Sequence, residues 1–86
     1  MLIIKTMTGQ MVNAERMLSF FVTPKDKTSY QAVIAKDDKG WDYTLGLYLS
    51  PERALEELGK LIEFLAKRNN GVYALQDYVI SGKEVV

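Results

Sequence analysis

The sequence predicts an α+β fold, in which a curved antiparallel sheet of five to six short strands is packed by one late amphipathic helix. Apolar side chains at every second position from 41 to 49 are typical of a strand with one buried face. Ser50 and Pro51 then begin a run with helical apolar spacing, which predicts the helix over about 51–68. The 86 residues, of which 48% are hydrophobic and 26% charged, predict a single folded domain over 1–86.

The first part of the sequence predicts three short strands. Residues 2–6 are apolar and β-branched, and a glycine turn connects them to a brief strand at 11–12. Asn13 is a suitable cap for a single helical turn before the next strand. Residues 17–23 alternate in polarity, so we expect one face of this third strand in the core. That face carries Leu18, Phe20 and Val22.

The rest of the chain predicts a second hairpin, the helix and a last strand. We expect residues 30–36 to form a strand and residues 37–40 to form a tight turn. The strand expected after this turn carries the largest apolar set. This set comprises Trp41, Tyr43, Leu45, Leu47 and Leu49. We expect four of these residues to pack against Leu55, Leu58, Ile62 and Leu65 of the helix: Trp41, Leu45, Leu47 and Leu49. Residues 72–80 predict the last strand, and the tail 81–86 is expected to be loosely ordered. A pleckstrin-homology-like small barrel, closed at one end by the helix, is a specific form of this fold.

Two segments of the chain have a familiar pattern: the run LGLYLSPERA over residues 45–54, and a stretch from Ile3 through Gly9 and Asn13 to residues 19–22. They resemble small proteins of Gram-positive bacteria and their phages. The resemblance implies a bacterial or phage origin and an α+β architecture. It implies no catalytic residue, cofactor or substrate.

The composition excludes several kinds of active site. The 11 basic and 11 acidic residues cancel, and the chain has no Cys and no His. It therefore lacks a thiolate nucleophile, an imidazole base and the usual ligands of zinc. Glu52, Glu56 and Glu63 share one stripe of the helix, but Lys60 and Lys67 on the same stripe neutralise it. We expect no catalytic, metal or cofactor site, and hence no enzyme.

Four aromatic residues are candidates for contact with a partner: Tyr48, Phe64, Tyr73 and Tyr78. Tyr73 and Tyr78 lie on opposite faces of the expected last strand, so we expect at least one of them outside the core. Phe64 lies about 60° outside the apolar arc of the helix, and Tyr48 lies on the strand face opposite to the apolar set. Aromatic residues left outside a small core are enriched at interfaces, although a curled sheet could also bury some of them in a minor core. The sequence thus predicts a protein-binding module or a homodimer. The dimer contact would be Phe64 or the edge of the last strand.

A nucleic-acid-associated accessory protein is the alternative function. Its contact residues would be lysines gathered at one end of the central hairpins, beside Tyr30 and Trp41: Lys25, Lys27, Lys36 and Lys39. Nucleic acid is the less favoured partner, because aspartates are interleaved with these lysines and the net charge is zero. The N-terminal apolar run is shorter than the roughly 7–15 residues of a signal peptide, so we expect a cytoplasmic protein without membrane contact.

Overall fold

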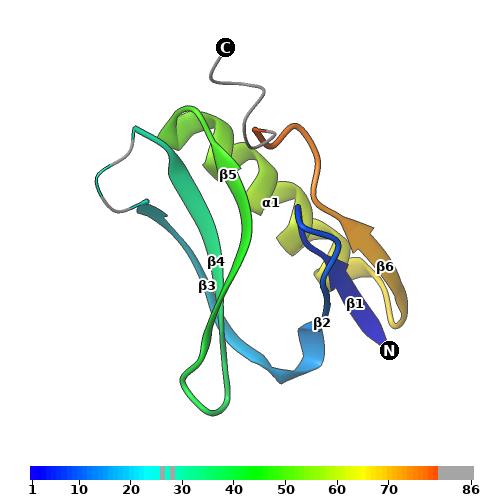
Figure 1. The fold of residues 1–86 in the computed structure, drawn as a ribbon. Coiled ribbons are helices and arrows are strands. Elements are labelled where there is room, and N and C mark those ends of the chain that lie inside the picture. Colours follow the sequence, from blue (N-terminus) through cyan, green and yellow to red (C-terminus); the bar gives the residue numbers. More distant parts are fainter. Residues whose placement is uncertain (26, 28, 80–86) are drawn as a thin grey trace.

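One three-stranded sheet connects the beginning of the sequence to its last strand. The computed structural model describes residues 1–25, 27 and 29–79. The sheet has the order β2-β1-β6, with β1 at Leu2–Lys5, β2 at Met11–Asn13 and β6 at Gly71–Ala74. β1 and β2 form an antiparallel hairpin, and β6 runs parallel to β1 (Figure 1). The hairpin turn contains Gly9 at a φ of 91°, which a residue without Cβ adopts at low cost.

The last strand is shorter than the sequence predicts, and it pairs differently. β6 ends at Ala74, after which the N–H of Leu75 still donates to the carbonyl of Lys5 at 3.0 Å. Position 80 of the expected strand, and the tail at 81–86, lie outside the described residues. A hairpin cannot join two parallel strands, and here β2, the whole second sheet and α1 lie between β1 and β6 in the chain.

The second sheet contains the three longest strands. Its order is β3-β4-β5, all antiparallel, with β3 at Met17–Pro24, β4 at Gln31–Asp37 and β5 at Asp42–Tyr48. The 3₁₀ turn η1 (Ala14–Arg16) leads into it from β2, capped by the side chain of Asn13 as the sequence predicts. An α+β fold with mainly antiparallel strands is thus confirmed. The expected single curved sheet, with its barrel form, is not confirmed, because the strands divide between two sheets.

A β-bulge in β5 changes which face of that strand is buried. The pairing register shifts between Val33 and Ile34 of β4, which makes Leu45 the extra residue of β5. Before the bulge the odd-numbered side chains of β5 point into the core, and after it the even-numbered side chains do. Tyr48 becomes buried, whereas Leu49, expected in the core, is 65% exposed. The prediction of strict alternation along this strand is wrong for that reason.

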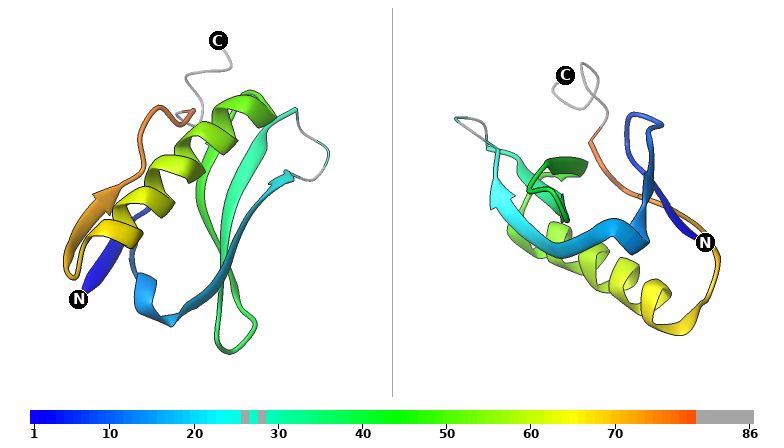
Figure 2. Two further views of the ribbon diagram at one scale, coloured as in Figure 1. Left: turned by 180° about the vertical axis from the view of Figure 1, so that it is seen from behind. Right: turned by 90° about the horizontal axis from the view of Figure 1, so that it is seen from below.

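Helix α1 (Pro51–Lys67) begins and ends within one residue of the prediction and lies between β6 and the second sheet (Figure 2). The hydroxyl of Ser50 caps it by accepting the N–H of Arg53 at 3.2 Å. Ala54 and Leu61 are fully buried. The predicted contacts of Leu55 and Ile62 are wrong, because α1 is turned so that Ala54 and Leu61 face the sheets.

The core lies where the inner faces of both sheets meet α1. Its largest fully buried side chains are Ile4, Val33, Leu45, Tyr48 and Leu61. Phe20 and Val22 of β3 pack against this core as expected. Leu18 does not and is 72% exposed, because a register shift between Met17 and Ser19 interrupts the alternation at the start of β3.

Candidate protein-interaction site

Tyr48, expected as a partner contact, is a core residue. Its side chain is 1% exposed, and its hydroxyl donates to the carbonyl of Gln76 at 2.9 Å. Burial, followed by the nearby charge of Glu57, raises the pKa of this hydroxyl above its usual value of 10.0. The expected surface position of Tyr48 is therefore wrong, since the bulge in β5 turns its ring inward.

The structure brings together two of the other three aromatic residues. The ring centroids of Phe64 and Tyr73 are 5.4 Å apart, and the guanidinium of Arg68 lies 5.3 Å from the centroid of Phe64. Both rings are half-buried between α1 and β6, and Tyr78 is half-buried against the main core. Tyr73 also packs against the main core, and contact of these three residues with a partner stays a prediction.

Glu57 is a buried carboxylate that sequence reasoning missed. It is 3% exposed, and its Oε2 accepts the hydroxyl of Tyr73 at 2.8 Å and the N–H of Gln76 at 3.0 Å. Burial and the hydrogen bond to Glu57 raise the pKa of Tyr73 above its usual range. Glu57 therefore fastens α1 to β6, and both hydrogen bonds are internal to the fold.

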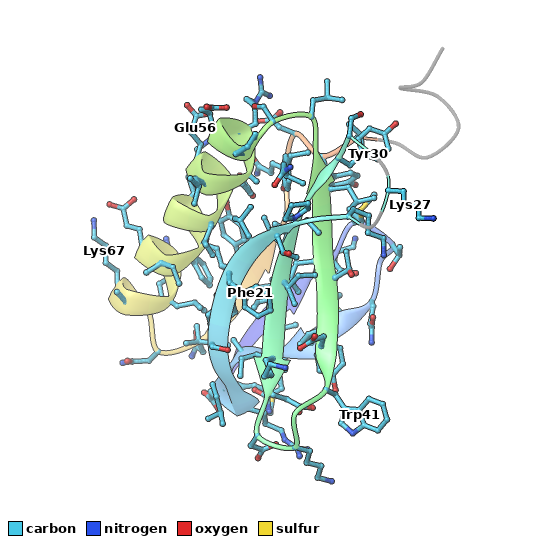
Figure 3. All side chains as sticks on the ribbon, turned by 90° about the vertical axis from the view of Figure 1, so that its left-hand side faces the viewer. Phe21, Lys27, Tyr30, Trp41, Glu56 and Lys67 are labelled. Carbon is cyan, nitrogen blue, oxygen red and sulfur yellow. The ribbon has the colours of Figure 1, made fainter. Side chains whose placement is uncertain are left out.

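The lysines of the predicted nucleic-acid surface divide between the two ends of the second sheet. Lys25 and Lys27 follow β3, whereas Lys36 and Lys39 lie at the other end of β4 and in the turn after it. β4 has 7 residues, so about 20 Å separates its ends. Figure 3 shows Lys27 and Trp41 far apart along the sheet. The expectation that the four lysines gather at one end is therefore wrong.

The free edge of β3 is the longest open edge in the two sheets. β3 has 8 residues, none of them charged, and it pairs on one side only. Among the described residues, β2 has 3 residues and β6 has 4, and the far edge of β5 receives the N–H groups of Met7 and Val79. Edge strands are usually short or charged, because an open row of N–H and C=O groups invites another strand.

The pairing of β3 with β4 fixes which backbone groups face this edge. The N–H of Lys25 donates to the carbonyl of Tyr30 at 2.9 Å. Because hydrogen-bonded pairs occur at every second residue of an antiparallel ladder, the backbone groups of the odd-numbered residues of β3 are hydrogen-bonded to β4. The N–H and C=O groups of Phe20 and Val22 therefore point away from the sheet. The side chain of Phe21 lies on the outer face of the sheet, where Figure 3 shows it in front of the strands.

α1 has an exposed apolar flank on the side of its axis that is opposite to β6. Leu55 is 57% and Ile62 is 44% exposed. Glu57 and Phe64 occupy the flank of α1 beside β6, so Leu55 and Ile62 occupy the opposite flank. Figure 2 shows the second sheet on the side of α1 that is opposite to β6. We define the edge surface by Leu18 and Phe21 of β3 together with Leu55 and Ile62 of α1.

A second candidate lies in the turn between β4 and β5. Oδ1 of Asp37 accepts the N–H groups of Lys39 at 2.8 Å and Trp41 at 2.9 Å, and Oδ2 accepts the hydroxyl of Tyr43 at 2.8 Å. Burial acts to raise the pKa of Asp37, but these hydrogen bonds and the charge of Arg16 together hold it below the usual value. The carboxylate thus fixes the turn that carries Trp41. The predicted packing of Trp41 against the helix is wrong, because Trp41 precedes β5 and is 67% exposed.

A groove of about 380 Å³ separates this turn from β2. Trp41, Lys39 and Tyr43 line one side, and the segment Gln10–Asn13 lines the other. Arg16 also lines the groove and contacts Asp38 at 3.4 Å. The sequence shows Trp41 and Lys39 but not the groove, because its two sides come from different sheets.

Comparison with protein-family models, curated proteins and solved structures finds no match. In the part of the chain that the structure describes, no three His, Cys, Asp or Glu side chains are grouped so that they could hold a metal ion. Within the same residues, no helix has the length and apolar character needed to cross a membrane.

Proposed function

We propose that this protein is a non-enzymatic interaction module that self-associates through the edge surface. The observation that carries the proposal is the uncharged, eight-residue edge of β3. A second copy is its simplest partner, because an antiparallel pair of identical strands about a two-fold axis satisfies both open edges at once. A cytoplasmic location and a bacterial or phage origin belong to the proposal on the sequence evidence alone.

The register of this dimer follows from the backbone groups at the edge. Phe20 exchanges hydrogen bonds with Val22 of the second copy, which places Phe21 opposite Phe21 of that copy on the outer face. Paired aromatic side chains on neighbouring strands stabilise a sheet. No charged residue lies within β3, so no like charges oppose each other along the paired strands.

Two further features favour association. The chain has a formal net charge of zero, so no long-range repulsion keeps two copies apart. Leu55 and Ile62 are exposed on the flank of α1 away from β6, and they would lose contact with water where a second copy covers them. A small domain gains disproportionately from such burial.

Sedimentation equilibrium at micromolar concentration tests the proposal. We expect a mass of twice 9.8 kDa for the wild type and 9.8 kDa for Phe21→Lys, because two lysines would meet at the axis. The matched control is Val72→Lys, a substitution at a 55% exposed position of β6, which should leave the dimer intact.

A wild-type mass of 9.8 kDa across this concentration range would contradict the proposal. Dissociation by Phe64→Glu, with Phe21→Lys still dimeric, would instead assign the dimer contact to the helix. Hydrogen exchange gives an independent measurement: dilution should speed the exchange of the Phe20 and Val22 amides together with dissociation.

A further inference from the structure

The groove between the β4–β5 turn and β2, which we name the Trp41 groove, is a recess at one end of the second sheet. Met17 is the one residue of β3 in its lining, and none of the four residues that define the edge surface lines it. Trp41 is the only tryptophan of the chain and is 67% exposed, and Met11 across the groove is 57% exposed. Exposed tryptophan and methionine side chains beside a recess are typical of the anchor points of protein interfaces.

The groove side that carries Trp41 is organised before any partner binds. The Asp37 carboxylate accepts two backbone N–H groups of the turn, and the N–H of Asp37 donates to the carbonyl of Trp41 at 3.0 Å. Tyr43 donates its hydroxyl to the second oxygen of Asp37. A side chain held on such a turn loses little backbone freedom on binding, which favours affinity.

The opposite side of the groove offers backbone hydrogen-bonding groups. Thr6 donates its N–H to the carbonyl of Gln10 at 2.9 Å, so Thr6 and Gln10 form a hydrogen-bonded pair. Hydrogen-bonded and non-hydrogen-bonded pairs alternate along an antiparallel ladder, so the next pair, Lys5 and Met11, is not hydrogen-bonded. By this alternation the N–H and C=O of Met11 point away from β1, and β2 is the last strand of its sheet. An extended peptide could therefore pair with β2, as partner strands do at open sheet edges.

The charges at the groove favour an acidic partner. Lys39 has no ion-pair partner among residues 1–25, 27 and 29–79. Arg16 contacts Asp38 only at 3.4 Å, and both side chains are about half exposed. Among the described residues that line the groove, Asp37 is the one carboxylate, and it already accepts three hydrogen bonds. A carboxylate on the partner would complement Lys39 and Arg16.

We infer that this groove binds an extended segment of another protein, with an apolar side chain between Trp41 and Met11 and an acidic side chain near Lys39 and Arg16. A peptide fits better than a nucleic acid because the groove offers a strand edge, which pairs with a peptide backbone. The zero net charge also provides no general attraction for a phosphate backbone.

A displayed library of random twelve-residue peptides is the probe. We expect selection on the wild-type protein, after removal of peptides that bind Trp41→Ala, to enrich sequences with an acidic residue close to a large apolar one. Synthetic peptides from this selection should shift the fluorescence of Trp41 saturably, since no other tryptophan contributes. The exchange of the Met11 amide should slow in the complex.

Variants then separate the parts of the site. Lys39→Glu should weaken binding of the selected peptides by about tenfold or more, and Met11→Ser should weaken it as well. Val72→Lys is the control, and the monomeric Phe21→Lys should bind as the wild type does, which keeps this inference separate from the dimer. Equal urea midpoints of wild type and Trp41→Ala show that the counter-selection variant is folded.

Three results would overturn the inference. The first is a selection that enriches no sequence over Trp41→Ala. The second is enriched peptides that bind Lys39→Glu as tightly as the wild type. The third is a poly-dT oligonucleotide that quenches Trp41 more strongly than any selected peptide and dissociates steeply with salt, which would make the groove a nucleic-acid site.

Discussion

Replacement of Glu57 by alanine should destabilise the protein by about 2–4 kcal/mol, because it removes the attachment of α1 to β6. Each hydrogen bond to a buried charged group contributes roughly 1.5–3 kcal/mol, and an unsatisfied buried donor costs about 1–3 kcal/mol. Glu57→Ala removes the acceptor of both Tyr73 and Gln76, although water can reach the vacated space in part. The loss is a large fraction of the roughly 4–13 kcal/mol expected for a domain of this size.

Urea denaturation measures this loss, and the adjacent helix position provides the control. Glu56 is exposed, so Glu56→Ala should change the free energy of unfolding by no more than about 0.5 kcal/mol. Glu57→Gln keeps an oxygen that can accept both donors and should lie between the two alanine variants. Equal midpoints for Glu57→Ala and Glu56→Ala would show that Glu57 does not hold α1 to β6.

Three further predictions follow from single contacts. Ser50→Ala should cost about 0.5–2 kcal/mol in urea denaturation and leave the sedimentation mass unchanged, because Ser50 only caps α1. The lowered pKa of Asp37 means that its contribution to stability is present above pH 3.8 and is lost as the pH falls further; Asp37→Asn should flatten this acid limb in thermal melts. The raised pKa values of Tyr48 and Tyr73 predict a loss of stability at alkaline pH. The stability should hold up to about pH 10 and fall above it, because these tyrosines then ionise in the unfolded chain before they do so in the folded protein. Tyr48→Phe should reduce this fall in the same thermal melts.

Local chemistry made the start of each helix predictable. Ser50 caps α1 and Asn13 caps η1, because a cap depends only on a side-chain oxygen and the N–H groups within the next turn. The turn between β4 and β5 was predictable for the same reason, since an Asp at its start and a Gly at its end suit a tight turn.

Non-local pairing was not predictable from the same patterns. The bulge at Leu45 depends on how β5 pairs with β4. Strict alternation therefore predicts the wrong buried face for the residues of β5 that follow Leu45. Gly46 was an available signal, because a glycine inside a strand often marks a bulge or a close approach. A Cβ at Gly46 would lie 3.1 Å from the ring of Tyr48, which shows why that position stays small.

The candidate surfaces were accessible from the sequence only in part. The sequence identifies Phe64 and Tyr73 as candidates, and the structure places their rings together. It does not identify Glu57, which accepts the hydroxyl of Tyr73. Its position about 60° from Ala54 on the helix, at the margin of the apolar arc, was the one signal available. The Trp41 groove requires knowledge of how the two sheets sit, which no local pattern contains.

The central place of β1 in its sheet has a consequence for biosynthesis. β1 leaves the ribosome before its parallel neighbour β6, which follows only after α1 has been made. Until then the nascent hairpin of β1 and β2 exposes an unpaired apolar strand, and the chain that must loop back contains the whole second sheet. Closing so long a loop is slow, so ribosome-bound chains that stop before Gly71 should be the species that chaperones recognise.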